Sequence, residues 1–539
     1  MTRDPAALVR RNNAKAGETG KHVSAGLELY PSNYDGIHRA EMRPEPPQLV
    51  LSQPDYERFR AFVQSRIGLD VTEDRRFMLG RALAEGMQAG ECADLDELYR
   101  LLQLSSNTSS VWDRVVSALT VGETYFFRNT GHFDALAKQI LPDLLAAREH
   151  SSRRLRIWSA GCATGEEPYS IAILLNELIP NLDSWNIFIL ATDINRDELR
   201  RAHEAQYGAW SFRGVDKRVQ DTYFQLNYRN LFALSEKIKR MVTFEYLNLV
   251  ADPYPSLANN TNAMDVILCR NVTIYFEDQV TQKVVSNFYA CLTDQGWLIP
   301  GAAEPNMVFY NAFEPRNFPG AVIYQKPATP KAKPALAVAF QPTAAASVVP
   351  VTPPRPIERP APIPARPPEV KEPPPRNTYE IAIELLQAGQ VDEALAKLYE
   401  HLDQDAEFIP TYYTLGKIYA NKGNLEEAQT WCERAIKKDK LHPEPYYTLS
   451  LVYEQIGLNE MAMDMLKKAI YLDRSFVLAH YNLAQLYQCQ GDETAARKSL
   501  QNARALLDGK PRDALVPEGD GLVVGRLLEL IENGLAQDA

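Results

Sequence analysis

The sequence predicts a protein of several domains: a small all-helical N-terminal domain, a doubly wound α/β domain and a C-terminal helical solenoid. Three observations support this fold class. Apolar residues recur every three or four positions between about residues 51 and 119, as in short amphipathic helices. Short apolar runs then alternate with helical patterns, which indicates a mostly parallel sheet covered on both faces. Beyond a proline-rich stretch, a 34-residue period predicts stacked helix pairs.

Composition limits the classes of function. The chain has 539 residues and a formal net charge of −11, so wholesale nucleic-acid binding is not indicated. No apolar run reaches the roughly 18 residues that a membrane-spanning helix needs. Six cysteines occur without a CxxC pair, which argues against zinc and against a disulfide framework. We therefore expect a cytoplasmic protein with free thiols, no metal site, no nucleic-acid partner and no direct membrane insertion.

The N-terminal third divides into two segments. Residues 1–47 are polar and aperiodic and are expected to form a flexible extension. Residues 48–121 are expected to form the all-helical domain. Its apolar pattern is carried by Tyr56, Phe59, Phe62, Val63, Phe77, Leu83 and Met87, followed by Leu95, Leu98, Leu101, Leu102, Val111, Val115 and Leu119.

The α/β domain is expected over residues 122–326. Its predicted strands are Leu155–Ser159, Ile187–Ala191, Val242–Tyr246, Val266–Cys269 and Gly296–Ile299. Its predicted helices are Ile171–Leu178, Arg196–Ala205 and Gln279–Thr293. Residues 327–376 hold 16 of the 36 prolines, so we expect a linker in polyproline II conformation. Ligands for SH3-like domains are a less favoured interpretation of the same prolines.

The repeat lies in residues 377–510 and comprises about four copies. Five offsets keep a 34-residue spacing: Leu415/Leu449/Leu483, Tyr419/Tyr453/Tyr487, Gly423/Gly457/Gly491, Ala428/Ala462/Ala496 and Ala435/Ala469/Ala503. A weaker copy starts at Ile381. This pattern resembles the tetratricopeptide repeat, whose small residues let paired helices approach closely. Such arrays bind peptides or helices, although a purely structural spacer remains an alternative. Residues 511–539 are expected to form a C-terminal helix and tail.

A glycine turn follows the first predicted strand. Gly161-Cys162-Ala163-Thr164-Gly165 leads into a helix that begins with Glu166 and Glu167, and Asp193 ends the second strand. In doubly wound sheets, ligands bind outside the carboxyl ends of the strands, and an acid after the second strand accepts hydrogen bonds from ribose hydroxyls. The GK[ST] of a phosphate-binding loop is absent. S-adenosylmethionine, a cationic nucleoside without phosphate, suits these carboxylates, but an unrelated nucleotide or a simple tight turn stays possible on this motif alone.

Further blocks point to one family. They are VGETYFFRNTGHF (121–133), GCATGEEPYS (161–170), TDI (192–194), YLNL (246–249) and MDVILCRNVTIYF (264–276). In this order and spacing they resemble the CheR-type chemotaxis protein methyltransferases, over roughly residues 48–326. That family transfers a methyl group from S-adenosylmethionine to glutamate carboxylates on chemoreceptors. The resemblance thus implies a protein-glutamate O-methyltransferase acting in signal transduction, with the cytoplasmic domain of methyl-accepting chemoreceptors as substrate and the repeats recruiting a partner or receptor.

The resemblance also implies site residues. Asp193 would take the ribose hydroxyls, Arg128 would meet the methionine carboxylate or the reacting region, and Tyr275 would lie near the methyl group. The implied cofactor-binding set is Thr124, Arg128, Glu167, Asp193, Asn248, Leu249, Cys269, Arg270 and Asn271; Arg128 and Tyr275 form the implied catalytic pair. A glutamate substrate is already ionised at neutral pH, so alignment and water exclusion, not a general base, would be the enzyme's task. Phe126, Phe127 and Phe276 could form a dry wall, although core packing is the favoured interpretation of the first two.

Several positions depart from the family pattern. Gly122 stands where relatives often carry asparagine, and Ala302 replaces the histidine of the G-H-S-E block at 301–304. The second helix of the N-terminal domain, expected within 73–91, has three arginines against four acids, so attraction to an acidic receptor would be weak. The hairpin region after Phe224 is short, which would leave recruitment to the repeats through the long linker. The alternative is a catalytically weak or inactive S-adenosylmethionine-binding scaffold that presents the repeat array.

Overall fold

The computed structural model describes residues 49–104, 109–328 and 377–537. The predicted N-terminal extension lies outside these residues, and so does nearly all of the predicted linker at 327–376. The described residues form two compact units: one combines residues 49–104, 109–328 and 407–537, and the other contains residues 377–406. Within the described residues, no helix is long and apolar enough to cross a bilayer.

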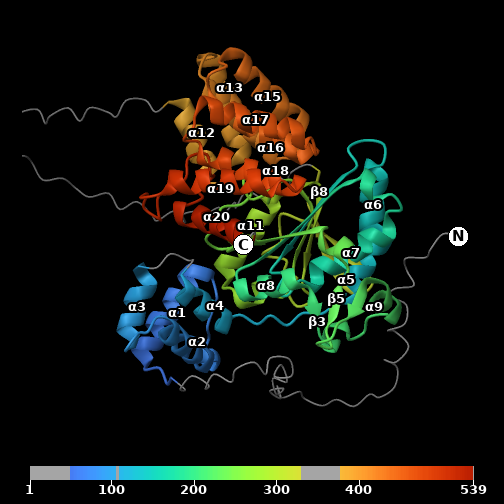
Figure 1. The fold of residues 1–539 in the computed structure, drawn as a ribbon. Helices are drawn as coiled ribbons and strands as arrows, with labels where there is room; N and C mark the ends of the chain where they lie inside the picture. Colours follow the sequence, from blue (N-terminus) through green and yellow to red (C-terminus); the bar gives the residue numbers. More distant parts are fainter. Residues whose placement is uncertain (1–48, 105–108, 329–376, 538–539) are drawn as a thin grey trace, which may run out of the picture. The chain divides into compact units, whose positions relative to one another are not determined.

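The first helices form a small domain with its own core, coloured blue in Figure 1. Its elements are α1 (Gln53–Ile67), η3 (Glu73–Arg75), α2 (Arg76–Ala89), α3 (Leu95–Leu104) and α4 (Ser110–Leu119). Ser52 caps α1 by accepting a hydrogen bond from the Asp55 amide. Phe77 lies in α2, as the pattern predicts, but it is 57% exposed, whereas Leu79 and Leu83 of the same helix are fully buried.

A seven-stranded sheet forms the centre of the larger unit, in the order β6-β2-β1-β7-β8-β10-β9. Its strands are β1 (Arg154–Ala160), β2 (Asn186–Asp193), β6 (Val242–Tyr246), β7 (Met264–Cys269), β8 (Leu292–Pro300), β9 (Glu314–Phe318) and β10 (Ala321–Gln325). The first five of these strands in chain order pair in parallel, and β10 runs antiparallel to both of its neighbours, β8 and β9. This arrangement confirms the predicted doubly wound class. From β1 the chain adds β2 and β6 on one side of the sheet and then β7 and β8 on the other side. The order of strands therefore switches between β1 and β7, and such sheets bind ligands at this switch point.

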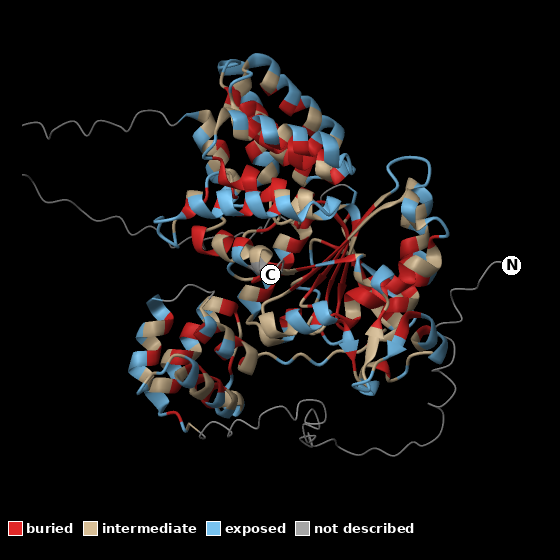
Figure 2. Ribbon diagram, viewed as in Figure 1, coloured by how far each residue is buried: buried red, intermediate tan, exposed pale blue. Residues whose placement is uncertain are grey.

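Helices cover both faces of the sheet, and Figure 2 shows its strands buried along most of their length. One face packs against α7 (Glu166–Leu178) and α8 (Arg196–Glu204), and the other packs against α11 (Asp278–Cys291). The predicted third helix ran two residues too far, since Leu292 and Thr293 already belong to β8. The remaining helices of this domain are α5 (Thr130–Ala135), a π-helical turn η4 (Leu136–Ile140), α6 (Leu141–Arg148), η5 (Leu182–Ser184), η6 (Ala209–Phe212), α9 (Lys217–Tyr223), α10 (Glu236–Lys239) and η7 (Thr273–Tyr275).

The short hairpin region forms a second sheet of three strands in the order β3-β5-β4. Its strands are β3 (Gln206–Tyr207), β4 (Phe224–Leu226) and β5 (Phe232–Leu234).

The repeats fold as antiparallel helix pairs, as predicted. In the larger unit they are α14 (Ile409–Asn421), α15 (Leu425–Lys438), α16 (Pro443–Ile456), α17 (Asn459–Leu472), α18 (Val477–Gln490) and α19 (Glu493–Leu507), followed by α20 (Val524–Gln537). The smaller unit holds one pair, α12 (Thr378–Gln387) and α13 (Val391–Gln404). Gly457 turns the chain within one pair with φ +89°, and the periodic alanines Ala428, Ala462 and Ala496 are completely buried.

Candidate functional site

The turn after β1 requires glycine. Gly161 has φ +82°, and a Cβ at this position would lie 2.3 Å from the Val272 side chain. The amides of Gly161 and Cys162 both donate to the Thr192 carbonyl, at 2.7 and 3.0 Å, so the turn is tied to the end of β2. Gly165 also has a positive φ of 90° where α7 begins. The turn therefore brings the ends of β1 and β2 together at the switch point of the sheet.

The two glutamates at the start of α7 have different roles. Glu166 is buried and accepts hydrogen bonds from the hydroxyls of Thr164 (2.5 Å) and Ser211 (2.9 Å), so it holds the turn from inside. Glu167 lines a cavity, but its carboxylate accepts from the Ser159 hydroxyl at 2.7 Å and pairs with Arg270 at 2.9 Å. Glu167 therefore stays at the cavity wall with its charge balanced by Arg270, and Glu166 does not line the cavity.

Arg270 joins the end of β7 to the segment that crosses in front of the sheet. Its guanidinium is buried and donates to the Arg128 carbonyl (2.5 Å) and to Asn129 Oδ1 (2.8 Å) as well as to Glu167. Arg128 itself directs its own guanidinium to the Glu123 carbonyl at 2.6 Å. Among the described residues, this guanidinium has no carboxylate partner, which leaves its charge available to a ligand.

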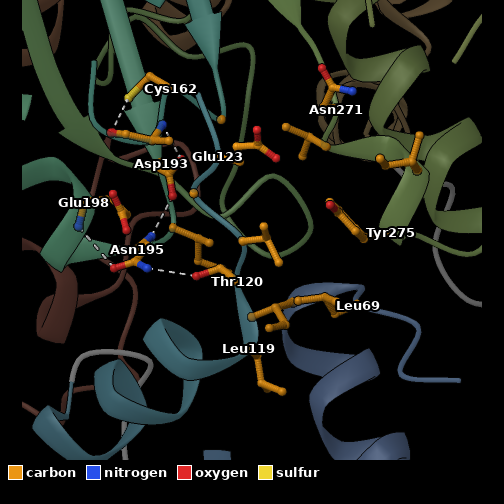
Figure 3. Close-up of a pocket in the computed structure, with 18 of the residues that line it drawn as sticks. Leu69, Leu119, Thr120, Glu123, Cys162, Asp193, Asn195, Glu198, Asn271 and Tyr275 are labelled. Carbon is orange, nitrogen blue, oxygen red and sulfur yellow. Dashed lines mark hydrogen bonds between the residues drawn. The ribbon is translucent and has the colours of Figure 1, made fainter. Parts of the chain in front are cut away.

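Asp193 ends β2 and faces the same cavity. Its carboxylate accepts hydrogen bonds from the amides of Ala163 (2.9 Å) and Asn195 (2.8 Å), and burial raises its pKa. Asn195 in turn donates from its side-chain amide to the Thr120 hydroxyl at 2.8 Å, as Figure 3 shows. These bonds fix the orientation of the carboxylate at the mouth of the β1 turn.

Asn248 and Leu249 follow β6 and line the cavity. The Asn248 side chain is committed to structure, since it donates to the Arg66 carbonyl of α1 at 2.8 Å and accepts from the Val250 amide at 3.0 Å. Cys269 does not line the cavity. It is buried as the last residue of β7 and packs with the core on the α11 face of the sheet.

Glu304 organises the loop that carries Asn271 and Tyr275. Its carboxylate accepts from the amides of Asn271, Val272 and Thr273 at 2.9 to 3.0 Å and from the Thr273 hydroxyl at 2.9 Å. A carboxylate with this many amide donors holds a loop firmly. The block at 301–304 thus keeps its glutamate in a clear structural role although Ala302 replaces the histidine.

Of the three phenylalanines considered for the cavity wall, two pack in the interior and one lines the cavity. Phe126 is 1% exposed and stacks on Phe212 with ring centroids 5.1 Å apart, so it belongs to the core. Phe127 packs on Phe133, with centroids 5.2 Å apart, and does not line the cavity. Phe276 does line it.

The cavity has a volume of about 350 Å³ and lies between the helical domain and the carboxyl ends of β1, β2, β6 and β7. Its walls include nine of the ten implied site residues, namely Thr124, Arg128, Glu167, Asp193, Asn248, Leu249, Arg270, Asn271 and Tyr275. The helical domain contributes Ile67, Leu69, Val71, Arg75 and Met78. No histidine is among the described residues that line it.

Backbone pairing joins the two domains at Tyr275. Leu69 and Phe276 form an antiparallel bridge, and the Asp70 amide donates to the Tyr275 carbonyl at 2.8 Å. The guanidinium carbon of Arg75 lies 5.0 Å from the centroid of the Tyr275 ring. Sequence reasoning did not single out Arg75, and it also missed Glu198 of α8, which faces the Asp193 side of the cavity.

Comparison with known proteins agrees with this geometry. Residues 122–317 match the CheR methyltransferase SAM binding domain, and residues 54–120 match the CheR methyltransferase all-alpha domain. Chemotaxis protein methyltransferase 2 of Vibrio cholerae is 30% identical over 280 residues, covering 52% of this chain and 95% of that protein. The chain belongs to the CheR methyltransferase family.

Other relatives of this CheR family member extend the likeness. Chemotaxis protein methyltransferase 1 of Pseudomonas aeruginosa is 32% identical, covering 48% of this chain and 92% of that protein. The probable biofilm formation methyltransferase WspC of Pseudomonas putida is 29% identical over 402 residues, which cover 72% of this chain and 91% of the relative. Residues 385–450 and 443–476 match tetratricopeptide repeats.

The methyl donor of this CheR family member is S-adenosylmethionine. The residues of the cavity suit that molecule. Four lining carboxylates, Glu123, Glu167, Asp193 and Glu198, accompany three arginines, and the turn offers no lysine to a phosphate. Such a balance accommodates a ligand with two cationic groups and one carboxylate better than it accommodates a dinucleotide.

Proposed function

We propose that the protein methylates glutamate side-chain carboxylates of methyl-accepting chemoreceptors. The observation that carries this proposal is the position of the cavity between the helical domain and the strand ends, with Tyr275 at the junction. A side chain presented by a receptor helix can enter from this junction.

The lining residues favour a substrate that needs no deprotonation. No histidine lines the cavity among the described residues, and the arginines Arg75 and Arg128 offer cationic groups to an ionised carboxylate. S-adenosylmethionine supplies an electrophilic methyl group when bound. The protein then has to orient the carboxylate and exclude water, which otherwise solvates both reacting charges. In our proposal, Arg128 and Tyr275 perform the orienting, and Ile67, Leu69 and Phe276 supply apolar walls.

The cofactor assignment follows the same strand ends. We assign the ribose to Asp193, the adenine to the main chain at Asn248 and Leu249, and the methionine carboxylate to the vicinity of Arg128 and Thr124. Arg270 and Glu167 act mainly by holding the segment at Arg128 in place. The repeats recruit a receptor or another protein, a role that fits the general use of such arrays.

The proposal is tested by methyl transfer. The full chain is incubated with S-adenosylmethionine carrying a labelled methyl group and with the cytoplasmic signalling fragments of receptors from the same organism. We expect base-labile label on a receptor, as methyl esters give. Arg128→Ala should reduce the rate about 100-fold through misplacement of the reacting groups. Arg316→Ala, at an exposed strand position, should match the wild type.

Cofactor binding is measured in parallel by calorimetry with S-adenosylhomocysteine. Tight binding without label on any receptor fragment would overturn the enzyme assignment and favour the scaffold alternative. Label that resists base would contradict the glutamate ester, since amide and amine products are stable under those conditions.

A further inference from the structure

Glu198 places an unsatisfied carboxylate oxygen at the cofactor cavity. It lies on the first turn of α8, and its amide donates to Asn195 Oδ1 at 3.2 Å, which fixes the start of the helix. Its side chain is only 15% exposed. Oε1 lies 3.6 Å from Arg201, whereas Oε2 is buried and has no hydrogen-bond partner among the described residues. A buried acceptor without a donor is costly, so this oxygen is suited to a donor supplied by a ligand.

Gly122 makes room for this carboxylate. A Cβ at position 122 would lie 2.8 Å from Glu198 Cδ, 2.9 Å from Oε1 and 3.1 Å from Oε2. Any larger residue at this position would therefore collide with the Glu198 side chain in its present position. The glycine that replaces the frequent asparagine thus does not leave an empty space in the cavity wall, because Glu198 fills it from the other side.

The neighbours of Glu198 indicate which donor it meets. Its carboxylate interacts electrostatically with Asp193, and Figure 3 shows the two side chains on the same side of the cavity, with Tyr275 on the opposite side. Both oxygens of Asp193 already accept a backbone amide, so only part of their capacity remains for a ligand. A ribose carries two hydroxyl donors at adjacent carbons, and Asp193 keeps about one lone pair on each oxygen, so a second acceptor beside it can share these donors.

We propose that Glu198 accepts a hydrogen bond from a ribose hydroxyl of S-adenosylmethionine, so that Glu198 and Asp193 share the ribose diol. This inference rests on the proposed placement of the ribose at Asp193. It makes Glu198 a cofactor-binding residue whose position depends on Gly122.

The electrostatics of the site agree with a neutral donor. The pKa of Glu198 is raised to about 7, mainly by burial; Arg201 opposes the rise, and Asp193, Glu166 and Asp197 contribute to it. A hydroxyl can donate to this carboxylate without adding a buried charge. Binding is best measured at pH 8, where a group with this pKa is mainly ionised.

The first measurement compares ligand affinities at pH 8. Calorimetry with S-adenosylhomocysteine and with 5′-methylthioadenosine is carried out on the full chain and on Glu198→Ala. We expect about tenfold weaker binding of both ligands by the variant, because both carry the ribose and only the first carries the amino acid. Glu198→Gln keeps the shape and an acceptor oxygen, so its loss should be smaller. Glu204→Ala, an exposed acid on the same helix, should bind like the wild type.

Ligand analogues then identify the donor. With 2′-deoxy and 3′-deoxy forms of methylthioadenosine, the affinity ratio of wild type to Glu198→Ala should fall to about one for whichever analogue lacks the donating hydroxyl. If the ratio stays at tenfold for both, or falls only with methylthioinosine, which lacks the adenine amine, the ribose assignment is wrong. A loss confined to S-adenosylhomocysteine would equally overturn it in favour of the ammonium group.

Two further variants separate this inference from the proposed site. Asp193→Asn should weaken all the ligands; if it does not, the ribose placement itself fails. If Asp193→Asn does weaken binding and Glu198→Ala binds normally, only the role of Glu198 is refuted.

Gly122→Ala should weaken binding in the wild-type background and be tolerated in Glu198→Ala, and equal losses of affinity in both backgrounds would contradict the proposed packing. Thermal denaturation of every variant without ligand reports whether folding is preserved.

Discussion

At the scale of single residues, neighbouring side chains of the same type serve different purposes. Glu166 and Glu167 are adjacent, yet one supports the turn from the core and the other pairs with Arg270 at the cavity. The strand-end pattern brought out Asp193, which ends β2, and the family resemblance brought out Asn271, which follows β7. They could not bring out Glu198, which reaches the cavity only through the first turn of a helix, or Arg75, which arrives from another domain.

His132 gives a residue-scale prediction about pH. It is 1% exposed, and burial together with the nearby Arg270 lowers its pKa to about 4. The unfolded chain, where histidine has a pKa near 6.5, therefore binds the proton more readily. Neutral His132 therefore contributes to the free energy of unfolding above about pH 6.5. This contribution, on the order of 2 to 3 kcal/mol, is lost as the pH falls towards 4.

Urea unfolding at a series of pH values measures this effect. His132→Gln should flatten the decline of the unfolding free energy between pH 6.5 and 4, and the exposed His150→Gln should not. The same slope in wild type and His132→Gln would show that other groups cause the decline.

At the scale of elements, the parallel strands and their helices were predictable because buried strands leave continuous apolar runs. The boundary between α11 and β8 was not, since Leu292 and Thr293 continue an apolar pattern that fits either element. The exposure of Phe77 has a related reason, since a spacing of three or four identifies a helical face but not which apolar residue at its edge is covered. Strands β9 and β10 were not predicted: β9, at the edge of the sheet, is largely polar and exposed, and β10 beside it is only five residues long.

The loop from Arg270 to Tyr275 provides the element-scale prediction. Glu304→Ala would leave the buried amides of this loop without their acceptor, so we expect about 3 kcal/mol of destabilisation and weaker cofactor binding. Glu304→Gln keeps one acceptor oxygen, so its stability and its cofactor affinity should lie between those of the wild type and those of Glu304→Ala. Urea unfolding and calorimetry with S-adenosylhomocysteine measure both effects. Glu314→Ala, at a partly exposed position of β9, is the control. If Glu304→Ala changed stability and cofactor binding no more than this control does, the organising role of Glu304 would be contradicted.

At the scale of the whole molecule, the C-terminal helix α20 contacts the methyltransferase domain through one polar network. Arg526 donates to the Tyr246 carbonyl at the end of β6 at 2.8 Å and pairs with Glu529 at 3.2 Å. Glu529 also pairs with Arg196 of α8 at 2.6 Å, and Arg196 approaches Asp113 of α4 at 3.3 Å. The repeat pattern did not predict this network, because Arg196 and Glu529 are more than 300 residues apart in the chain.

Removing the central arginine tests this network. Arg526 is 8% exposed, and Arg526→Ala leaves Glu529 with fewer cations, so we expect α20 to be destabilised by about 2 to 3 kcal/mol. Faster hydrogen exchange of the α20 amides in the full chain is the readout. Arg504→Ala, an exposed position on α19, should leave exchange in α20 unchanged. Unaltered exchange in Arg526→Ala would mean that apolar packing alone holds the helix.

The pairing of Leu69 with Phe276 makes the cavity a joint property of two domains. A ligand that binds only the closed pair stabilises the junction by mass action, by about 2.7 kcal/mol when its concentration is 100 times its dissociation constant. Neither domain alone gains this free energy. For such a ligand, the free energy that holds the two domains together therefore rises with the concentration of the ligand.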